Sequence, residues 1–263
     1  MPKSNSLQIC LVKTGPTTPM ITTLELRPLG NDTYTTQTGT LKLLDRHYYA
    51  SESDIFGIRY PDDVYDRKWD LVFPSNEIWI NTTANVNQSR PFELPQAVMK
   101  RAITPKKATE PLTLLFLSDE NPSDKFYVYF HFAEIQALRA NDSREFDIVW
   151  EDTTFLPPYS PKRFQSDTLF NKLPKEQGTV KLVRTKGSTL PPLISAIEAF
   201  KVMDLPYSET NTDDVVSMKN IEAAYALNFI SWQGDPCLPR QYKWDYIECS
   251  YTSISTPPRI ISL

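Results

Sequence analysis

Hydrophobic and polar side chains alternate along most of residues 54–203, which is the pattern of half-buried β-strands. The clearest such segment, Phe126–Ala133, is almost wholly aromatic or β-branched, and Phe146–Trp150 follows it. Loops rich in Asn, Asp and Pro separate the segments, and no long helical pattern stands between them. We therefore predict one all-β domain over residues 54–203, an antiparallel sandwich of jelly-roll type. Further strands are expected at Ile55–Tyr60, Leu112–Leu117, Thr179–Arg184 and Ile194–Val202, the last two as a closing hairpin, with a short helix at Gln96–Ile103.

The last part of the chain, residues 204–263, has a different pattern. Four apolar side chains recur at helical spacing over Asp213–Leu227, which predicts an amphipathic helix. They are Val215, Met218, Ile221 and Tyr225. The expected N-cap is Thr212 or Asp213. A final strand is expected to begin at Arg259.

Two segments resemble each other and indicate an internal duplication. Leu11–Leu29 and Leu182–Val202 both run from a strand through a basic, Gly-containing turn and a proline into a second strand. Ile21 then matches Ile194, and Glu25 matches Glu198. Residues 1–29 are accordingly interpreted as the terminal hairpin of a truncated first domain, and residues 30–53 as a linker. We expect exposed apolar surface around Leu7, Ile9 and Leu11, and around Ile260 and Leu263.

Composition narrows the classes of function. The 263 residues carry a formal net charge of −4, and their basic residues are dispersed, so nothing attracts the chain to nucleic acid or anionic lipid. The sequence has no apolar run long enough to span a membrane, and its first residues lack the apolar core of a signal peptide. Asn-x-Ser/Thr sequons nevertheless favour a secretory context, with the true N-terminus upstream. These expected glycosylation sites are Asn31, Asn81, Asn87 and Asn141.

Cysteine and histidine residues are few. Cys237 and Cys249 flank a loop rich in proline and aromatic residues, which fits a disulfide, although two buried thiols remain the alternative. Cys10 is expected to be a buried, inert thiol. His47 and His131 are far apart with no metal-ligand spacing, so we expect no metal and no cofactor. His131 is interpreted as a hydrogen-bonded core residue.

Carboxylates and aromatic rings concentrate in Arg59–Trp69, with the sequence RYPDDVYDRKW. Because rings stack on sugar faces while carboxylates accept sugar hydroxyl protons, this segment is a candidate ligand site. Its five candidate residues are Tyr60, Asp62, Asp63, Tyr65 and Trp69. In one alternative the two aspartates form a glycosidase pair, although neighbouring residues of an extended chain point to opposite sides. In the other, the aspartates make turn hydrogen bonds and the rings pack beneath the sheet.

Several segments together resemble the plant malectin-like family. They are SLQICLVKTGPTTPMITTLELRPL, RYPDDVYDRKW, FYVYFHFAEIQAL followed by NDSREFDI, and PPLISAIEAFKV. SWQGDPCLPRQYKWDYIEC followed by PPRIISL is similar to the segment that caps the first leucine-rich repeat in the same receptors. The resemblance implies a malectin-like jelly-roll fold over residues 54–203 and a disulfide-capped N-terminal cap of leucine-rich repeats over residues 204–263.

The same resemblance implies a function. Such chains are ectodomains of receptor-like kinases on the extracellular face of the plasma membrane, so we expect a non-catalytic recognition module. Its expected partner is a cell-wall glycan or an extracellular peptide or protein, with a co-receptor beside it. Two alternatives stay open, a lectin that binds cell-wall polysaccharide directly and, with less support, a glycoside hydrolase.

Overall fold

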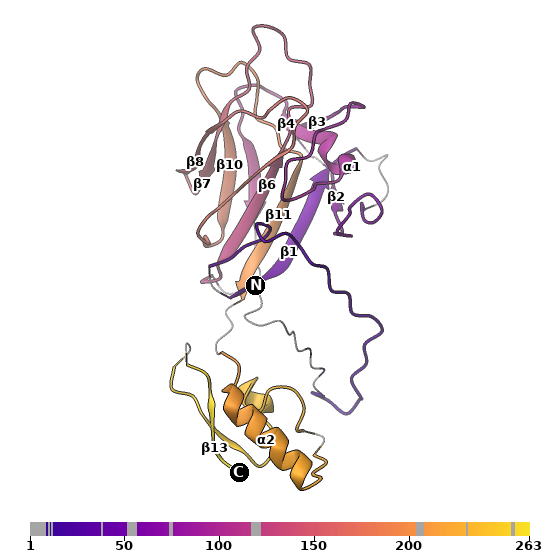
Figure 1. The fold of residues 1–263 in the computed structure, drawn as a ribbon. Coiled ribbons are helices and arrows are strands. Elements are labelled where there is room, and N and C mark those ends of the chain that lie inside the picture. The colour runs from indigo at the N-terminus through magenta and orange to yellow at the C-terminus, as the bar shows by residue number, and fades with distance from the viewer. Residues whose placement is uncertain are drawn as a thin grey trace. The chain divides into compact units, whose positions relative to one another are not determined.

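The computed structural model describes residues 9, 11, 13–37, 39–51, 57–73, 76–116, 122–203, 208–229, 231–253 and 256–263. The chain divides into two compact units (Figure 1). The larger unit is Arg27–Met203, and the smaller one comprises Met1–Leu26 and Asp204–Leu263. Within the described residues, no helix is long and apolar enough to cross a membrane.

Two sheets form the larger unit, as Figure 1 shows. The five-stranded sheet has the order β2-β1-β11-β6-β9, with bounds Asp70–Val72, Thr40–Tyr49, Ala196–Met203, Phe126–Phe132 and Asp167–Phe170. The four-stranded sheet has the order β5-β10-β7-β8, with bounds Leu112–Phe116, Gly178–Arg184, Phe146–Trp150 and Thr153–Tyr159. A separate ribbon pairs β3 (Glu77–Asn81) with β4 (Arg101–Pro105), and the short helix α1 spans Gln96–Met99.

Aromatic side chains fill the space between the two sheets. The ring of Phe132 on β6 lies 5.4 Å from Phe146 on β7 and 5.2 Å from Tyr159 on β8, measured between centroids. Phe130 and Ile148 are completely buried in the same core. This packing confirms the predicted all-β sandwich, and β6 and β7 coincide closely with the strongest predicted strands.

Part of the segment predicted as a linker, residues 30–53, is instead a strand of the sheet. Thr40–Tyr49 forms β1, which pairs antiparallel with β11 and parallel with β2. A register shift between Leu43 and Asp45 interrupts the two-residue alternation. The strand was therefore hidden from a periodicity argument, because a bulge moves the following side chains to the other face.

The predicted closing hairpin is also wrong, because its two strands lie in different sheets. β10 pairs with β5 and β7, whereas β11 pairs with β1 and β6. The connection between them contains Pro191 and Pro192 and crosses from one layer to the other. The first residue assigned to the second strand, Ile194, instead forms an isolated bridge with Ile103.

The edge strand β8 was not predicted, because it contains Pro157 and Pro158. Proline lacks an N–H donor and is tolerated only where a strand has a free side, which an edge provides. The helix expected over Gln96–Ile103 stops at Met99, and β4 begins at Arg101.

No strand occurs among the described residues between 13 and 29, so the predicted terminal hairpin is not formed there. A lone hairpin is marginal in water, which explains the difference. Ile9 and Leu11 are about half exposed, at 46% and 49%, in agreement with the expected apolar surface. Leu7, Cys10 and Ile55 lie outside the described residues.

The smaller unit packs a helix beside a two-stranded sheet. Helix α2 spans Thr212–Ala224, the sheet pairs β12 (Glu248–Ser250) with β13 (Arg259–Ser262), and a 3₁₀ turn, η1, covers Arg240–Tyr242. Met218, Trp232, Trp244 and Ile247 form its core. Ile260 packs against this core, whereas Leu263 is exposed as expected.

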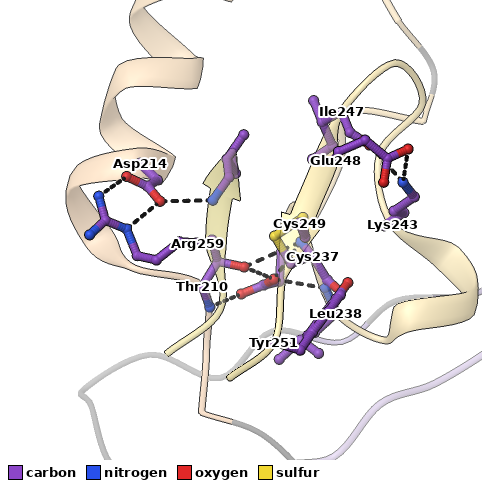
Figure 2. Close-up of a disulfide and its surroundings, with 12 residues drawn as sticks. Thr210, Asp214, Cys237, Leu238, Lys243, Ile247, Glu248, Cys249, Tyr251 and Arg259 are labelled. Carbon is purple, nitrogen blue, oxygen red and sulfur yellow. Dashed lines mark hydrogen bonds and ion pairs between the residues drawn. A yellow bond between two sulfur atoms is a disulfide. The ribbon is translucent and has the colours of Figure 1, made fainter. Parts of the chain in front are cut away.

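The helix N-cap is Asn211, one residue before the first predicted candidate. Its side-chain oxygen accepts hydrogen bonds from the backbone N–H groups of Asp213 and Asp214. Asp214 lies in the first turn, where its charge favours the helix dipole. Its carboxylate also accepts hydrogen bonds from Arg259, as Figure 2 shows, and from the backbone N–H of Ile260, which fastens β13 to the helix.

Cys237 and Cys249 form the disulfide of this unit, with a Cα–Cα distance of 6.0 Å (Figure 2). The adjacent loop is held by Asp235, whose carboxylate accepts hydrogen bonds from Thr210, Cys237 and Leu238. A 12-residue separation makes this a short covalent loop, which stabilises a small unit by restricting its unfolded state.

Candidate functional site

The segment singled out by its carboxylates and rings forms a closed surface loop. Ile58 and Trp69 pair with each other through two backbone hydrogen bonds of 3.1 and 2.9 Å at its base. Inside the loop, the N–H of Asp63 donates to the carbonyl of Arg59. The N–H of Asp66 donates in turn to the carbonyl of Asp63. We refer to residues 59–66 as the display loop.

Asp63 holds the display loop from inside. It is completely buried, and its carboxylate accepts hydrogen bonds from the backbone of Tyr65, from Arg67 Nε and from Trp69 Nε1, at 2.8, 2.8 and 2.7 Å. Trp69 is completely buried as well. These two candidate ligand residues therefore have an internal role, because neither side chain reaches the surface.

Asp66 braces the same loop from its outer side and was missed in the sequence. Its carboxylate accepts two hydrogen bonds from Arg59, one from the backbone of Tyr60 and one from Arg27. The hydrogen bond from Arg59 keeps the pKa of Asp66 below its ordinary value. Asp66 has a φ of 51°, a left-handed conformation that aspartate tolerates better than most residues. In the sequence, only the basic pair that follows it, Arg67 and Lys68, could have marked it.

The remaining candidates are displayed to different degrees. Tyr60 is 70% exposed, and Asp62 and Val64 are exposed beside it. Tyr65 is half-buried, with the guanidinium of Arg67 5.3 Å from its ring centroid. Since Asp62 is exposed and Asp63 is buried, the two carboxyl groups do not face one bond as a glycosidase pair would.

Beneath the display loop lies a buried polar network on the outer face of the five-stranded sheet. Glu198 of β11 is fully buried and accepts Arg46 Nε at 2.6 Å, His131 Nε2 at 3.0 Å and the hydroxyl of Tyr34 at 2.7 Å. Arg67 donates to both Asp63 and Tyr34, so it joins the loop to this network. His131 is thus the hydrogen-bonded core residue predicted from the sequence.

The pKa values of both Glu198 and His131 are lowered in this network. Burial raises the pKa of Glu198, but the hydrogen bond from His131 and the charges of Arg46 and Arg67 outweigh it and lower the pKa to about 2. Burial lowers the pKa of His131 despite its bond to Glu198. The network therefore holds charged Glu198 between two arginines and a neutral imidazole.

A second buried ion pair braces the loop after β6. Arg144 Nε lies 2.6 Å from Glu134 Oε2, and both side chains are almost fully buried. Arg144 also donates to Gln136 Oε1 at 2.7 Å. The two ends of this loop are thereby joined.

The four sequon asparagines are all exposed, so each could accept a glycan. They are Asn31 in a turn, Asn81 at the end of β3, Asn87, and Asn141 in the loop before β7. Across the described residues, no three His, Cys, Asp or Glu side chains gather in a way that could hold a metal ion.

Comparison with known proteins places these features in a family. The sequence profile of the malectin-like domain family matches residues 1–202. Along its full length the chain is 58% identical to the probable LRR receptor-like serine/threonine-protein kinase At2g28960 of Arabidopsis thaliana. It is 46% identical, again over its full length, to a second such kinase of that plant, At5g59680. The chain spans 30% of the length of each of these relatives.

A solved structure shares the fold. The crystal structure of the plant receptor-like kinase FER has a TM-score of 0.52 at 17% identity, over 66% of this chain and 55% of that one. At this identity the likeness concerns the fold alone. The family match, together with the relatives that align along the whole chain, shows that the chain belongs to the malectin-like domain family. It aligns with part of leucine-rich-repeat receptor-like kinases.

Proposed function

We propose that this chain is an extracellular ligand-recognition module of a receptor-like kinase type protein, and that the display loop is part of its contact surface. One observation carries the proposal. Asp63 holds the loop from inside and Asp66 from its outer side, while Tyr60, Asp62 and Val64 remain exposed. A contact surface that is already ordered loses little conformational entropy on binding, which favours affinity.

The location in the proposal has independent support. The relatives are named as receptor-like kinases, and the four exposed sequons fit a chain that passes through the secretory pathway. We place the module at the extracellular face of the plasma membrane. Mass spectrometry of the chain secreted from plant cells tests this placement, and unmodified asparagines at all four positions would count against it.

The burial of the rings favours an extracellular peptide or protein over a cell-wall glycan as the ligand. A sugar platform needs open ring faces. Trp69 is buried and Tyr65 is partly covered by Arg67, so Tyr60 is the most open of the three candidate rings. An exposed tyrosine on the same loop as an exposed carboxylate and an exposed aliphatic side chain makes a mixed surface typical of protein contacts. A co-receptor could share this surface.

The decisive experiment is a binding screen of the secreted chain against extracellular peptides, receptor ectodomains and cell-wall glycans. For any ligand found, Tyr60→Ala should weaken binding at least tenfold, because Tyr60 is the more exposed of the two tyrosines on the loop. Tyr225→Ala is the matched control, since Tyr225 is 75% exposed on the smaller unit. Equal binding by both variants would refute a role for the display loop, and binding of glycans alone would favour the lectin.

We also propose that residues 204–263 form the N-terminal cap of leucine-rich repeats. The support is a small disulfide-linked unit whose last strand, β13, pairs with β12 on one side. Extending the chain with the repeats of its relative should slow amide exchange in β13. Unchanged exchange of Ile260 and Ile261 would contradict this assignment.

A further inference from the structure

Tyr34 lies far from the display loop in sequence but is joined to it through the buried network. It belongs to residues 27–37, which we call the strap, the segment that opens the larger unit and leads into β1. Its backbone has a φ of 52°, in the left-handed region that tyrosine rarely adopts. The surroundings must therefore hold this conformation in place.

The tyrosine side chain is fixed by both its ring and its hydroxyl. The ring packs at 4.9 to 5.6 Å from the rings of Phe92, Tyr129 and Phe200. The hydroxyl lies 2.7 and 2.9 Å from the two carboxylate oxygens of Glu198 and donates its proton there. It also accepts a hydrogen bond of 2.9 Å from Arg67 Nη1. The strap is thus attached to the outer face of the sheet through a buried side chain.

Arg67 carries this attachment into the display loop. Its side chain is only 6% exposed and donates in three directions, to Tyr34, to the carbonyl of Glu93 and to Asp63 Oδ2. Because the guanidinium is planar, these three bonds fix one orientation of its donors. Asp63 Oδ2 receives that arginine while Asp63 Oδ1 receives the backbone N–H of Tyr65. The order of the loop therefore depends on where Arg67 is held.

A second contact joins the same two segments at the surface. Arg27, at the start of the strap, donates to Asp66 Oδ2 at 2.8 Å, beside Arg59. The side chain of Arg27 is 40% exposed, so this ion pair is screened by solvent and is weaker than the buried link. Both acids that brace the display loop, Asp63 and Asp66, are consequently connected to the strap.

We propose that Tyr34 is a positioning residue for the display loop, and that the strap and the loop are conformationally coupled through Arg67. When the phenol is in place, Arg67 is oriented toward Asp63 and the loop is ordered for binding. When the strap moves away, Arg67 loses an acceptor, and its hold on Asp63 weakens. The affinity of the display loop is then regulated by the segment that leads into the sandwich. This last consequence depends on the proposed function, whereas the coupling itself does not.

Hydrogen–deuterium exchange without ligand tests the coupling. Tyr34→Phe keeps the ring contacts and removes only the hydroxyl. We expect the amides of Asp63, Tyr65 and Asp66, which are hydrogen-bonded inside the loop, to exchange at least threefold faster. Tyr159→Phe is the matched control, because its hydroxyl bonds Asp167 at 3.2 Å and is not part of the network. This control should leave the loop amides unchanged.

The outcomes separate coupling from general destabilisation. Faster exchange confined to the strap, or spread evenly over the whole sandwich, would overturn the proposal. Arg67→Lys provides a second variant, since lysine keeps the charge but loses the three-way fork, and it should accelerate the same amides as Tyr34→Phe. Loop amides that respond to neither variant would also overturn it.

Binding data distinguish this inference from the proposed function. If a ligand is found, Tyr34→Phe should lower its affinity severalfold, although the buried side chain at position 34 does not contact the ligand. If Tyr60→Ala has no effect on binding while Tyr34→Phe still loosens the loop, the function fails and the coupling stands. If Tyr60→Ala weakens binding and Tyr34→Phe changes neither exchange nor affinity, the coupling fails and the function stands.

Discussion

The two units of this chain are stabilised in different ways. The sandwich buries a continuous apolar core and, on the outer face of one sheet, a network of paired charges around Glu198. The smaller unit has a short core centred on Trp232 and Trp244 and adds a disulfide. A large domain can bury charges because its apolar core outweighs their desolvation. A small one gains more from a covalent link that restricts the unfolded chain.

The largest effect is expected from removing the central acid of the sandwich network. Glu198→Ala leaves Arg46 without its buried partner, which typically destabilises by about 3–5 kcal/mol. Urea unfolding measures this loss, and hydrogen–deuterium exchange of the β6 and β11 amides locates it in the sandwich. Asp152→Asn is the control, because its ion pair with Lys181 is exposed and should contribute little, and asparagine tolerates the φ of 61° at this position. Comparable losses for the two variants would show that burial of the network has no special weight.

Replacing both Cys237 and Cys249 with serine should destabilise the smaller unit by about 3 kcal/mol, the value for a short closed loop. Exchange in α2 should rise strongly, while exchange in β6 should not change. The comparison of the units would be wrong if the sandwich melted earlier as well.

Acid should weaken the sandwich, with an effect smaller than that of Glu198→Ala. The folded pKa of Glu198 is lowered to about 2, so its stabilisation is complete above the ordinary value of 4.5 and is lost as the pH falls toward 2. The pKa of His131 is also lowered, so below pH 6.5 the unfolded chain binds this proton first and folding weakens further. Thermal unfolding between pH 7 and pH 2 should show a falling midpoint. A flat profile would mean that neither group is linked to folding.

The smallest effect concerns the helix cap. Asn211→Ala should destabilise the smaller unit by about 1 kcal/mol, because two backbone N–H groups lose their acceptor. Thr212→Ala is the neighbouring control, since Thr212 is the first residue of α2 rather than its cap. A larger loss for Thr212→Ala than for Asn211→Ala would instead support Thr212, one of the caps predicted from the sequence.

Local pattern was sufficient where it was uninterrupted. Phe126–Phe132 and Phe146–Trp150 were predictable because their alternation and composition agree with a buried strand. β1 was missed because a bulge breaks its period, and the β10–β11 hairpin was wrong because neighbouring strands in sequence can enter different layers. Pairing depends on distant residues that periodicity does not identify.

The sequence marked Arg59–Trp69 as a candidate site, and the structure divides its residues into a buried frame and an exposed surface. The sequence drew attention to Asp63 and Trp69, which are the internal frame, together with Tyr60 and Asp62, which are exposed. Glu198 was noticed only as the match of Glu25. Its partner Arg46 is 152 residues away, so no local motif could show that they meet.

The two prolines of β8 have a consequence for how the folded molecule behaves at high concentration. The outer strand of a sheet can recruit a strand from a neighbouring molecule through its unsatisfied backbone groups. Pro157 and Pro158 lack N–H groups, so β8 offers a further strand fewer donors and intermolecular strand addition is disfavoured there. The same two prolines that made β8 hard to predict from the sequence therefore oppose aggregation through this edge.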